Sequence, residues 1–370
     1  MSSAAVDGPM RILVLCKRAP QKRDLLERPY GRFFFLPRAL ATRGHIVHML
    51  LADYRGNHPI TEERHGLYWH SQPLRPYPWK WMKTAKRLAV GLDPDWIIGL
   101  SDTWYGIAAS SLARTTGARV MIDAYDNYEA YIPVAKPLHW LWRRALARAE
   151  LRCAAGGPLL QQIAAGKHRG HDVVVPMAAD PIFLPLNKAA CRRQLGLDPS
   201  ATLVGHIGSL HGSRDAAAML GAMRYLRDRC PRCQFVFSGR GRNRMRLPAN
   251  AVHLGYIADD LMPALVNAMD AVISANRTDA FGEHSYPVKL YESAACGVPF
   301  VTSSTQSTRW ITGNDPRFLY EPGNAQDLAD KLCNLLKKPE TISAMAGGWE
   351  ASAKILLDSL ENLAARRAAD

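Results

Sequence analysis

The sequence lacks any apolar run of roughly 18 residues, the minimum for a membrane-spanning helix. Residues 1–9 are small and polar, without the basic start and apolar core of a secretory signal peptide. The seven cysteines are odd in number and follow no framework spacing, so reduced thiols are expected. We therefore expect a cytoplasmic protein that could associate with a membrane only peripherally, at the inner face of the plasma membrane.

Several ligand-binding motifs are missing or incomplete. Cys230 and Cys233 form a lone Cys-x-x-Cys, without the two further ligands that a zinc site needs. No Asp-x-Asp lies where it could hold a metal for a nucleotide, and residues 239–242 form only part of a Gly-x-Gly-x-x-Gly dinucleotide motif. No recognised nucleic-acid motif is present. The sequence thus predicts no metal, no cofactor and no nucleic-acid partner.

Positive charge is abundant and unevenly placed. The chain of 370 residues has a net charge of +14, and residues 1–90 contain 16 Lys and Arg against 6 Asp and Glu. The stretch 73–90 mixes Tyr77, Trp79 and Trp81 with lysine and arginine, and the stretch 139–144 repeats this mixture. Aromatic and cationic side chains together are favoured at anionic membrane surfaces. Core tryptophans beside solvated charges would produce the same pattern, so both interpretations stay open.

Short apolar runs, typical of buried parallel strands, alternate with segments of helical pattern throughout the chain. In the first half, the expected strands are 11–16, 46–51, 96–100 and 120–123, and the expected helices are 33–42, 105–115 and 138–155. In the second half, the expected strands are 202–206, 234–238, 252–254 and 271–274, and the expected helices are 187–196, 215–229, 258–268 and 342–367. This alternation predicts an α/β fold of two doubly wound domains facing each other across a cleft.

The segment 281–303 is the most informative of the chain. A polar loop leads into a short helix, which Pro287 can begin and Gly297 can end, and an apolar strand follows. Lys289 and Glu292 are three residues apart and therefore share a helix face. A helix start that carries a cation and a carboxylate suits a ligand with phosphates and a sugar diol. An ordinary buried helix–strand unit is the alternative.

Residues 285–301, Ser-Tyr-Pro-Val-Lys-Leu-Tyr-Glu-Ser-Ala-Ala-Cys-Gly-Val-Pro-Phe-Val, resemble the donor-nucleotide motif of GT-B glycosyltransferases, especially family four, also named glycosyl transferases group 1. The resemblance covers about residues 200–355. It implies two Rossmann-like domains, at 1–185 for the acceptor and 186–345 for the nucleotide-sugar donor. It also implies that the C-terminal segment, 346–370, is a helix that packs back on the first domain.

The resemblance implies roles for the donor motif. Glu292 would hold the ribose hydroxyls, and the diphosphate would face the segment made of Ser285, Tyr286, Pro287, Val288 and Lys289. The family often has a glutamate eight positions before Glu292, where this chain has His284, with Glu283 one residue out of step.

Two further turns are expected at the donor. Gly208 and Ser209 follow a strand and allow a phosphate to approach the backbone closely. Arg240 would then contact the donor phosphates, as the GT-B resemblance implies, unless it belongs to a solvated basic turn.

The loop 121–131 carries the predicted catalytic group. It follows a strand and contains three carboxylates, one of which could deprotonate an acceptor hydroxyl. By the resemblance, Asp126 is the predicted base, Glu129 the reserve, and Asp123 more typical of a structural residue. The predicted acceptor-binding residues come from other loops and include a possible helix cap, Asp102. They are Arg18, Tyr30, Arg32 and Asp102.

Together these features predict a metal-independent, membrane-associated glycosyltransferase of bacterial type. It would transfer a sugar from a nucleotide diphosphate sugar, as co-substrate, to a lipid-linked or polysaccharide acceptor. A nucleotide-sugar epimerase and a non-catalytic scaffold of the same fold remain alternatives. A base at Asp126 implies inversion at the anomeric carbon, whereas family four is typically retaining, so both stereochemical outcomes stay open.

Overall fold

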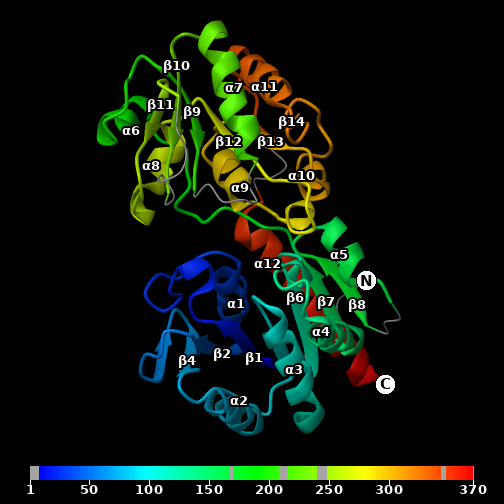
Figure 1. Cartoon of the computed structure of the whole chain (residues 1–370). Coiled ribbons are helices and arrows are strands. Elements are labelled where there is room, and N and C mark those ends of the chain that lie inside the picture. Colours follow the sequence, from blue (N-terminus) through cyan, green and yellow to red (C-terminus); the bar gives the residue numbers. More distant parts are fainter. Residues whose placement is uncertain (1–7, 167–169, 209–214, 240–247, 343–346, 370) are drawn as a thin grey trace. The chain divides into compact units, whose positions relative to one another are not determined.

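The chain forms two compact units in the computed structural model, which describes residues 8–166, 170–208, 215–239, 248–342 and 347–369 (Figure 1). Unit 1 comprises Met1–Met177 together with Trp349–Asp370, and unit 2 comprises Ala178–Gly348. Each unit contains its own sheet with helices packed against it, and we describe the two in turn.

Within the described residues, the sheet of unit 1 has eight strands in the order β3-β4-β2-β1-β5-β6-β7-β8. All neighbouring strands are parallel except β3 and β4, which are antiparallel. The strands are β1 (Arg11–Lys17), β2 (Ile46–Asp53), β3 (Ile60–Arg64), β4 (Leu67–Pro73), β5 (Trp96–Gly99), β6 (Arg119–Ala124), β7 (Leu151–Ala154) and β8 (His171–Val174).

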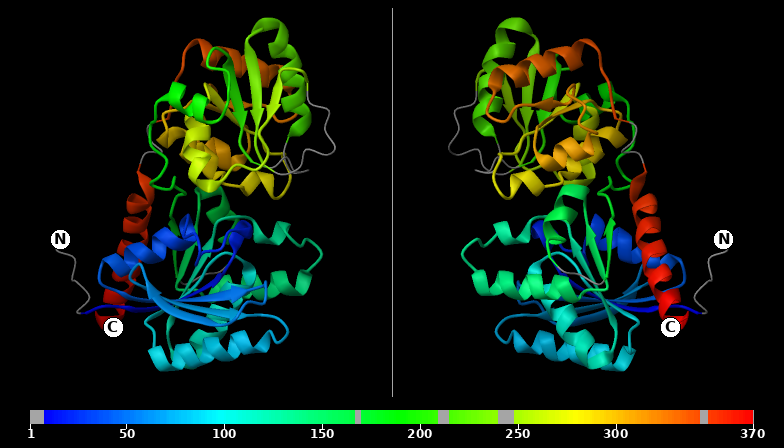
Figure 2. Two further views of the ribbon diagram at one scale, coloured as in Figure 1. Left: turned by 90° about the vertical axis from the view of Figure 1, so that its left-hand side faces the viewer. Right: turned by 90° about the vertical axis from the view of Figure 1, so that its right-hand side faces the viewer.

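Helices cover both faces of this sheet, with α1 on one side and α2 and α3 on the other (Figure 2). The helices are α1 (Arg32–Thr42), α2 (Trp79–Leu92), α3 (Thr103–Thr116), α4 (Lys136–Arg148), α5 (Gly157–Ile163) and α12 (Gly348–Ala369). Residues Ile12 to Cys16 of the central strand β1 are completely buried, as expected for a parallel strand covered on both faces.

The last helix, α12, belongs to unit 1. The Trp349 ring stacks on that of Phe35 in α1, with centroids 5.9 Å apart, and the Ser352 hydroxyl donates to the Pro176 carbonyl at 3.0 Å. Further along, the Arg119 guanidinium donates to the Ala364 carbonyl at 3.4 Å. These contacts tie the end of the chain to the unit in which the chain began.

The structure corrects the predicted helix 138–155. Helix α4 ends at Arg148, and residues 151–154 form strand β7 between β6 and β8. The alanine-rich sequence is compatible with a helix, but burial between two strands overrides local propensity. Arg152 lies inside this strand and pairs with Asp172, its partner on β8, at 2.7 Å.

The sequence interpretation also assigned no elements to the hairpin β3–β4 or to helix α2. His65 and Gly66 form the two-residue turn of the hairpin, with φ of 59° and 74°. Two consecutive positive φ values are typical of a type I′ turn, which asparagine and glycine favour more strongly than histidine does. Because histidine is not typical of this turn, the sequence did not predict the hairpin.

In unit 2, the described residues form a parallel sheet in the order β11-β10-β9-β12-β13-β14 (Figure 1). Its strands are β9 (Thr202–His206), β10 (Cys233–Phe237), β11 (Ala251–His253), β12 (Ala271–Ser274), β13 (Phe300–Ser303) and β14 (Leu319–Tyr320). Its helices are α6 (Lys188–Gln194), α7 (Ala216–Arg229), α8 (Met262–Asn267), α9 (Val288–Ala295), α10 (Gln306–Ile311) and α11 (Ala325–Lys337).

The strand order of unit 2 identifies where a ligand should bind. Numbered from β9, the order is 3-2-1-4-5-6, that of a doubly wound nucleotide-binding sheet. The order reverses between β9 and β12, and ligands of such sheets bind outside the carboxyl ends of the strands at this switch point. We therefore expect a ligand of unit 2 to bind near two segments. One follows β9 and begins at Ile207, and the other follows β12 and begins at Ala275.

Candidate functional site

The carboxyl end of the unit 2 sheet is lined by small polar groups. The Ser238 hydroxyl, after β10, accepts a hydrogen bond from the Gly208 N–H at 3.3 Å. The Ser303 hydroxyl, at the end of β13, accepts from the Asn276 N–H at 2.8 Å. Both serines and Asn276 are buried. The loops that follow β9 and β12 are thus held in fixed positions on either side of the switch point.

Two predicted donor-binding residues, Gly208 and Lys289, meet at this point. Gly208 has a φ of +119°, and a Cβ placed on it would lie 2.9 Å from Lys289 Cε and 3.3 Å from Lys289 Nζ. The two residues are far apart in sequence, and the fold brings the ammonium group of one over the backbone of the other. An ammonium group beside a backbone held by glycine is an arrangement that suits an anion.

The rest of the predicted donor segment surrounds helix α9. Pro287 is the N-cap with a φ of −71° and a ψ of 113°, and Val288 and Lys289 form the first turn. Ser285 and Tyr286 are buried before it, and the Ser285 carbonyl accepts from the Ser307 hydroxyl at 2.7 Å. The sequence predicted that Pro287 would occupy the first helical turn. In the structure it lies just before that turn, at the N-cap.

Glu292 lies one turn into α9, where only 8% of it is exposed. It lies three residues after Lys289, so the cation and the carboxylate project from neighbouring positions of one helix. Gly297 adopts a φ of +69° just after the helix, as predicted for its stop. Ser209 and Arg240, the other two predicted donor contacts, lie outside the described residues.

The loop before α9 is tightly folded. A Cβ on Gly282 would lie only 1.9 Å from the Arg277 carbonyl, so this position requires glycine. The Glu283 carboxylate accepts from the Gln306 N–H at the start of α10, at 2.8 Å. Burial lowers the pKa of His284 and so favours its neutral imidazole. Glu283 thus binds the N-terminus of a helix, next to the half-buried His284.

In unit 1, the predicted base Asp126 lies in the loop after β6 and is 8% exposed. The Tyr131 hydroxyl donates to its Oδ2 atom at 2.8 Å. Burial, and then the charge of Asp126, raise the pKa of Tyr131 above its ordinary value, so this hydroxyl remains a donor. Sequence reasoning did not identify Tyr131, although its place five residues after Asp126 in a tyrosine-rich loop was a visible signal.

Arg32, a predicted acceptor-binding residue, is buried. Its guanidinium binds both oxygens of Asp123, at 2.7 Å and 2.6 Å, and also the Val175 carbonyl. Only 1% of Arg32 is exposed, so the structure offers no support for direct contact between this side chain and an acceptor. Asp123 instead joins α1 to β6 through this ion pair, in line with the structural role expected of it.

The remaining predicted acceptor residues also have internal partners. Arg18 is 4% exposed and pairs with Asp24 at 2.9 Å and with Asp53 at 3.3 Å. The Tyr30 hydroxyl donates to the Pro20 carbonyl. Asp102 is the N-cap of α3 and accepts from the Thr103 N–H at 2.7 Å, which is the alternative that the sequence left open. None of these residues is in the lining of the cavity that includes Asp126.

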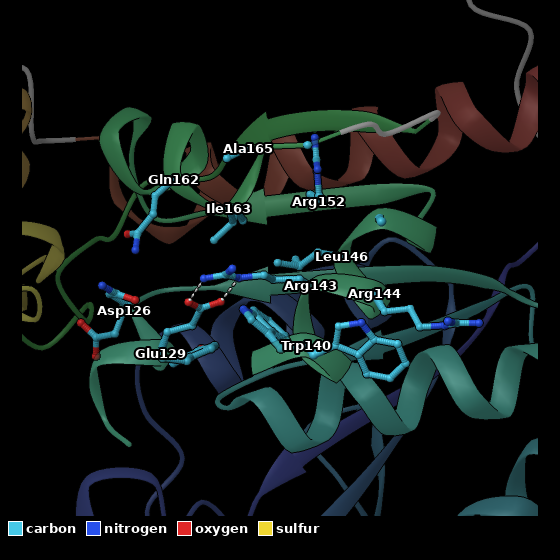
Figure 3. A pocket seen from close by; sticks show the side chains of 15 residues that line it. Asp126, Glu129, Trp140, Arg143, Arg144, Leu146, Arg152, Gln162, Ile163 and Ala165 are labelled. Carbon is cyan, nitrogen blue, oxygen red and sulfur yellow. Dashed lines mark hydrogen bonds and ion pairs between the residues drawn. The ribbon is translucent and has the colours of Figure 1, made fainter. Parts of the chain in front are cut away.

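A cavity of about 510 Å³ in unit 1 includes Asp126 in its lining (Figure 3). Its walls come from the loop after β6, from α4, from Arg152 of β7, and from the end of α5 with the residues that follow it. Glu129 and Arg143 face each other there through two hydrogen bonds of 2.8 Å and 2.6 Å (Figure 3). Within the described ranges, no three His, Cys, Asp or Glu side chains gather as metal ligands would.

Part of the chain matches the model of a known protein family. Residues 201–338 match the model of the family described as "Glycosyl transferases group 1". The chain has the GT-B fold of glycosyltransferases, and its second unit matches this family. The predicted resemblance and fold class are therefore confirmed, and the matched range contains Gly208, Lys289 and Glu292.

Curated relatives share part of the sequence. The D-inositol 3-phosphate glycosyltransferase of Segniliparus rotundus is 29% identical over 227 residues, which are 55% of this chain and 49% of that protein. Its counterpart in Thermobispora bispora is 31% identical over 205 residues, 48% of this chain and 44% of that protein. The chain thus matches about half the length of these curated relatives.

Solved structures show the fold over nearly the whole chain. Sucrose-phosphate synthase of Thermosynechococcus elongatus matches with a TM-score of 0.68 at 15% identity, covering 97% of both chains. Anabaena HepE, solved in complex with UDP and glucose, matches with a TM-score of 0.70 at 15% identity, covering 98% of this chain and 100% of that one. At such identities the likeness is one of fold.

Proposed function

We propose that this chain is a glycosyltransferase that moves a sugar from a nucleotide diphosphate sugar to a lipid-linked or polysaccharide acceptor at the cytoplasmic face of the membrane. The observation that carries the proposal is the placement of Lys289 over Gly208, at the switch point of a doubly wound sheet. The match of residues 201–338 to a glycosyltransferase family supports the same conclusion.

The donor site explains how the nucleotide would leave. The Lys289 ammonium group lies where it can neutralise the charge that grows on the diphosphate as its bond to the sugar breaks. The positive φ of Gly208 and the missing Cβ leave room for phosphate oxygens beside the backbone. Glu292 would accept hydrogen bonds from the ribose hydroxyls, so that binding energy from the nucleoside positions the reacting bond.

In unit 1, Asp126 would act as the base. The acceptor hydroxyl gives its proton to the carboxylate while its oxygen forms the bond to the anomeric carbon. The bond from that carbon to the diphosphate breaks, and the nucleoside diphosphate leaves with the electron pair. The hydrogen bond from Tyr131 holds the carboxylate of Asp126 in one orientation.

Support for a membrane partner comes from exposed aromatic and cationic side chains of unit 1. On α2, Trp79 is 64% exposed, and the neighbouring cations, Lys80, Lys83, Lys86 and Arg87, are exposed as well. Trp81 of the same helix is buried, as the alternative of a core tryptophan predicts. Among the described residues, no helix has the length and apolar character that crossing a membrane requires.

A second group of exposed side chains lies on α4 and just before it, and Trp140 and Arg144 of this group line the cavity. Val134 is 85% exposed, and Trp140 and Leu141 of α4 are 58% and 40% exposed. Next to them, the Arg144 guanidinium lies over the Trp140 ring, 5.3 Å from its centroid. Apolar side chains beside cations are suited to the boundary between lipid head groups and acyl chains. This neighbourhood would bring a lipid-linked acceptor close to Asp126.

The donor proposal is tested by calorimetric titration of the purified chain with UDP, GDP, CMP and ADP. We expect one of these nucleotides to bind, and Glu292→Ala to weaken its binding at least tenfold because the ribose loses its acceptor. Asp260→Ala removes an exposed carboxylate of the same unit and should bind as the wild type does. Failure of all four nucleotides to bind would contradict the proposal and favour a non-catalytic scaffold.

A further inference from the structure

The cavity in unit 1 differs from the acceptor site that the sequence predicted. It is lined by Asp126, but the predicted acceptor residues Arg18, Tyr30, Arg32 and Asp102 are absent from its lining. Its volume of about 510 Å³ lies within the range of roughly 300–1,000 Å³ that is usual for small-ligand sites. A ligand in this cavity would therefore lie beside the proposed base, away from the buried residues around Arg18.

Among the described residues that line the cavity or form ion pairs with its arginines, positive and negative side chains are equal in number. Three guanidinium groups line it, from Arg143, Arg144 and Arg152, and Asp126 and Glu129 contribute two carboxylates. The third carboxylate belongs to Asp172, which binds Arg152 through two hydrogen bonds of 2.7 Å. Two of the three guanidinium groups already bind carboxylates, Arg143 with Glu129 and Arg152 with Asp172, and Asp126 adds a further negative charge. The described part of the cavity therefore offers little net attraction to a phosphate or a carboxylate.

The polar groups of the cavity are also held in place. The Glu129–Arg143 pair is bidentate, which fixes both planar groups, and the Arg144 guanidinium is stacked on Trp140. Gln162 adds an amide that can both donate and accept hydrogen bonds, and it points toward the same space (Figure 3). Fixed donors beside fixed acceptors suit a ligand whose hydroxyl groups do both.

We propose that this cavity binds an uncharged, hydroxyl-rich saccharide part of the acceptor, and that it presents one hydroxyl group to Asp126. The inference rests on the proposed function, and it names the substrate class of the acceptor side. The curated relatives are named for a phosphorylated acceptor, D-inositol 3-phosphate, and the balanced charge of this cavity predicts a different preference. Any phosphate of a lipid-linked acceptor would lie outside the cavity.

The test measures binding of three neutral probes, maltotriose, cellotriose and chitotriose, by saturation-transfer NMR with the whole chain. Inorganic phosphate and glucuronate serve as charged probes of the same site. Two variants alter exposed side chains of the lining, Trp140→Ala and Gln162→Ala, and neither should affect folding. The matched control is Trp79→Ala, which removes an exposed tryptophan that does not line the cavity.

We expect at least one neutral trisaccharide to bind to the wild type and to Trp79→Ala, and at least tenfold more weakly to both cavity variants. The inference is overturned if the cavity variants bind as the wild type does, if only phosphate or glucuronate binds, or if no probe binds. Nucleotide binding is measured on the same preparations and should be equal in all of them. If the wild type bound no nucleotide, the donor proposal would be refuted instead. Failure of the donor proposal and failure of the saccharide inference are therefore distinguishable.

Discussion

The two sheets of this chain share a strand order but differ at their switch points. The order β4-β2-β1-β5-β6-β7 in unit 1 repeats the order β11-β10-β9-β12-β13-β14 in unit 2. In unit 2 the point of reversal holds Gly208 with Lys289 beside it. In unit 1, Arg18 follows β1 at the corresponding point and is buried against Asp24 and Asp53.

This difference teaches that topology locates a possible site while side chains decide how it is used. The lysine at the switch point of unit 2 is half-buried beside the backbone of a glycine, whereas the arginine of unit 1 is buried and bound by two carboxylates. The cavity of unit 1 that includes Asp126 lies further along the sheet, around the segments that follow β6 and β7.

The largest expected effect is on stability. It distinguishes a buried cation of unit 1, which should stabilise the fold, from a cation of unit 2, which should bind the nucleotide. Arg32→Met leaves the Asp123 carboxylate buried without its partner, and we expect the unfolding free energy of unit 1 to fall by about 3–5 kcal/mol. Lys289→Met, at a half-buried position, should cost less than about 1 kcal/mol and should weaken nucleotide binding instead. Urea unfolding and nucleotide titration of both variants check this contrast.

Arg38→Met is the control for the first of these variants, because Arg38 is an exposed guanidinium on the same helix. Its stability should remain within about 0.5 kcal/mol of the wild type. If Arg32→Met proved equally harmless, the ion pair with Asp123 could not be the connection that joins α1 to the sheet.

The second largest effect is expected on nucleotide affinity, when the glycine of the proposed donor site is replaced. Gly208→Ala places a methyl group 2.9 Å from Lys289 Cε at a φ of +119°, so it should displace the lysine and weaken nucleotide binding at least tenfold. Gly255→Ala, at a φ of +70° with open space around it, should lower stability by about 1–2 kcal/mol and leave nucleotide binding unchanged. Equal nucleotide affinity in the two variants would show that Gly208 matters only for its backbone.

The sequence predicted much of unit 2 because its signals are local. The residues 285–301 are contiguous, and the beginning and end of α9 follow from Pro287 and Gly297. The approach of Lys289 to Gly208 could not be predicted from spacing, since it depends on how β9 and α9 pack in the folded unit. The family resemblance supplied the roles of these residues, and the structure supplied their contact.

Unit 1 was less predictable because its important contacts are distant in sequence. Arg152 lies in an alanine-rich segment that has the pattern of a helix, and its partner Asp172 comes from another strand. The cavity is likewise assembled from four separate segments, around Asp126, Arg143, Arg152 and Gln162. No local pattern in any one of these segments indicates the other three.

A smaller effect is expected at the proposed base. Tyr131→Phe removes the hydroxyl that donates to Asp126 and holds its carboxylate in one orientation. We therefore expect kcat to fall by about tenfold, because the base is less well positioned, while the affinity for nucleotide stays unchanged. Tyr77→Phe, at an exposed position on another loop, should keep the wild-type kcat. An unchanged kcat in Tyr131→Phe would mean that this hydroxyl does not act on the base.

The smallest effect is a pH dependence of stability within unit 1. His48 Nδ1 and His70 Nε2 lie 3.0 Å apart, with Tyr68, Thr61 and Arg87 around them. Burial, with the charges of His48 and Arg87, lowers the pKa of His70 to about 4. Below the ordinary pKa of 6.5 the unfolded chain therefore binds a proton that the folded chain does not, and folding becomes less stable as pH falls toward 4.

Thermal unfolding between pH 7 and pH 4 measures this dependence. His70→Gln should make the Tm of unit 1 less sensitive to pH, whereas replacement of the exposed His58 by Gln should leave the slope as it is. A wild-type slope in His70→Gln would assign the acid sensitivity to other groups.

The central claim, that the carboxyl end of the unit 2 sheet is the donor-nucleotide site, is tested most directly by hydrogen–deuterium exchange with and without the nucleotide that binds. The account predicts slower exchange in peptides that cover residues 203–208 and 285–297, and no change in the loop that carries Asp126. The claim would be contradicted if exchange became slower only in unit 1, or if saturating nucleotide did not slow exchange in these two peptides.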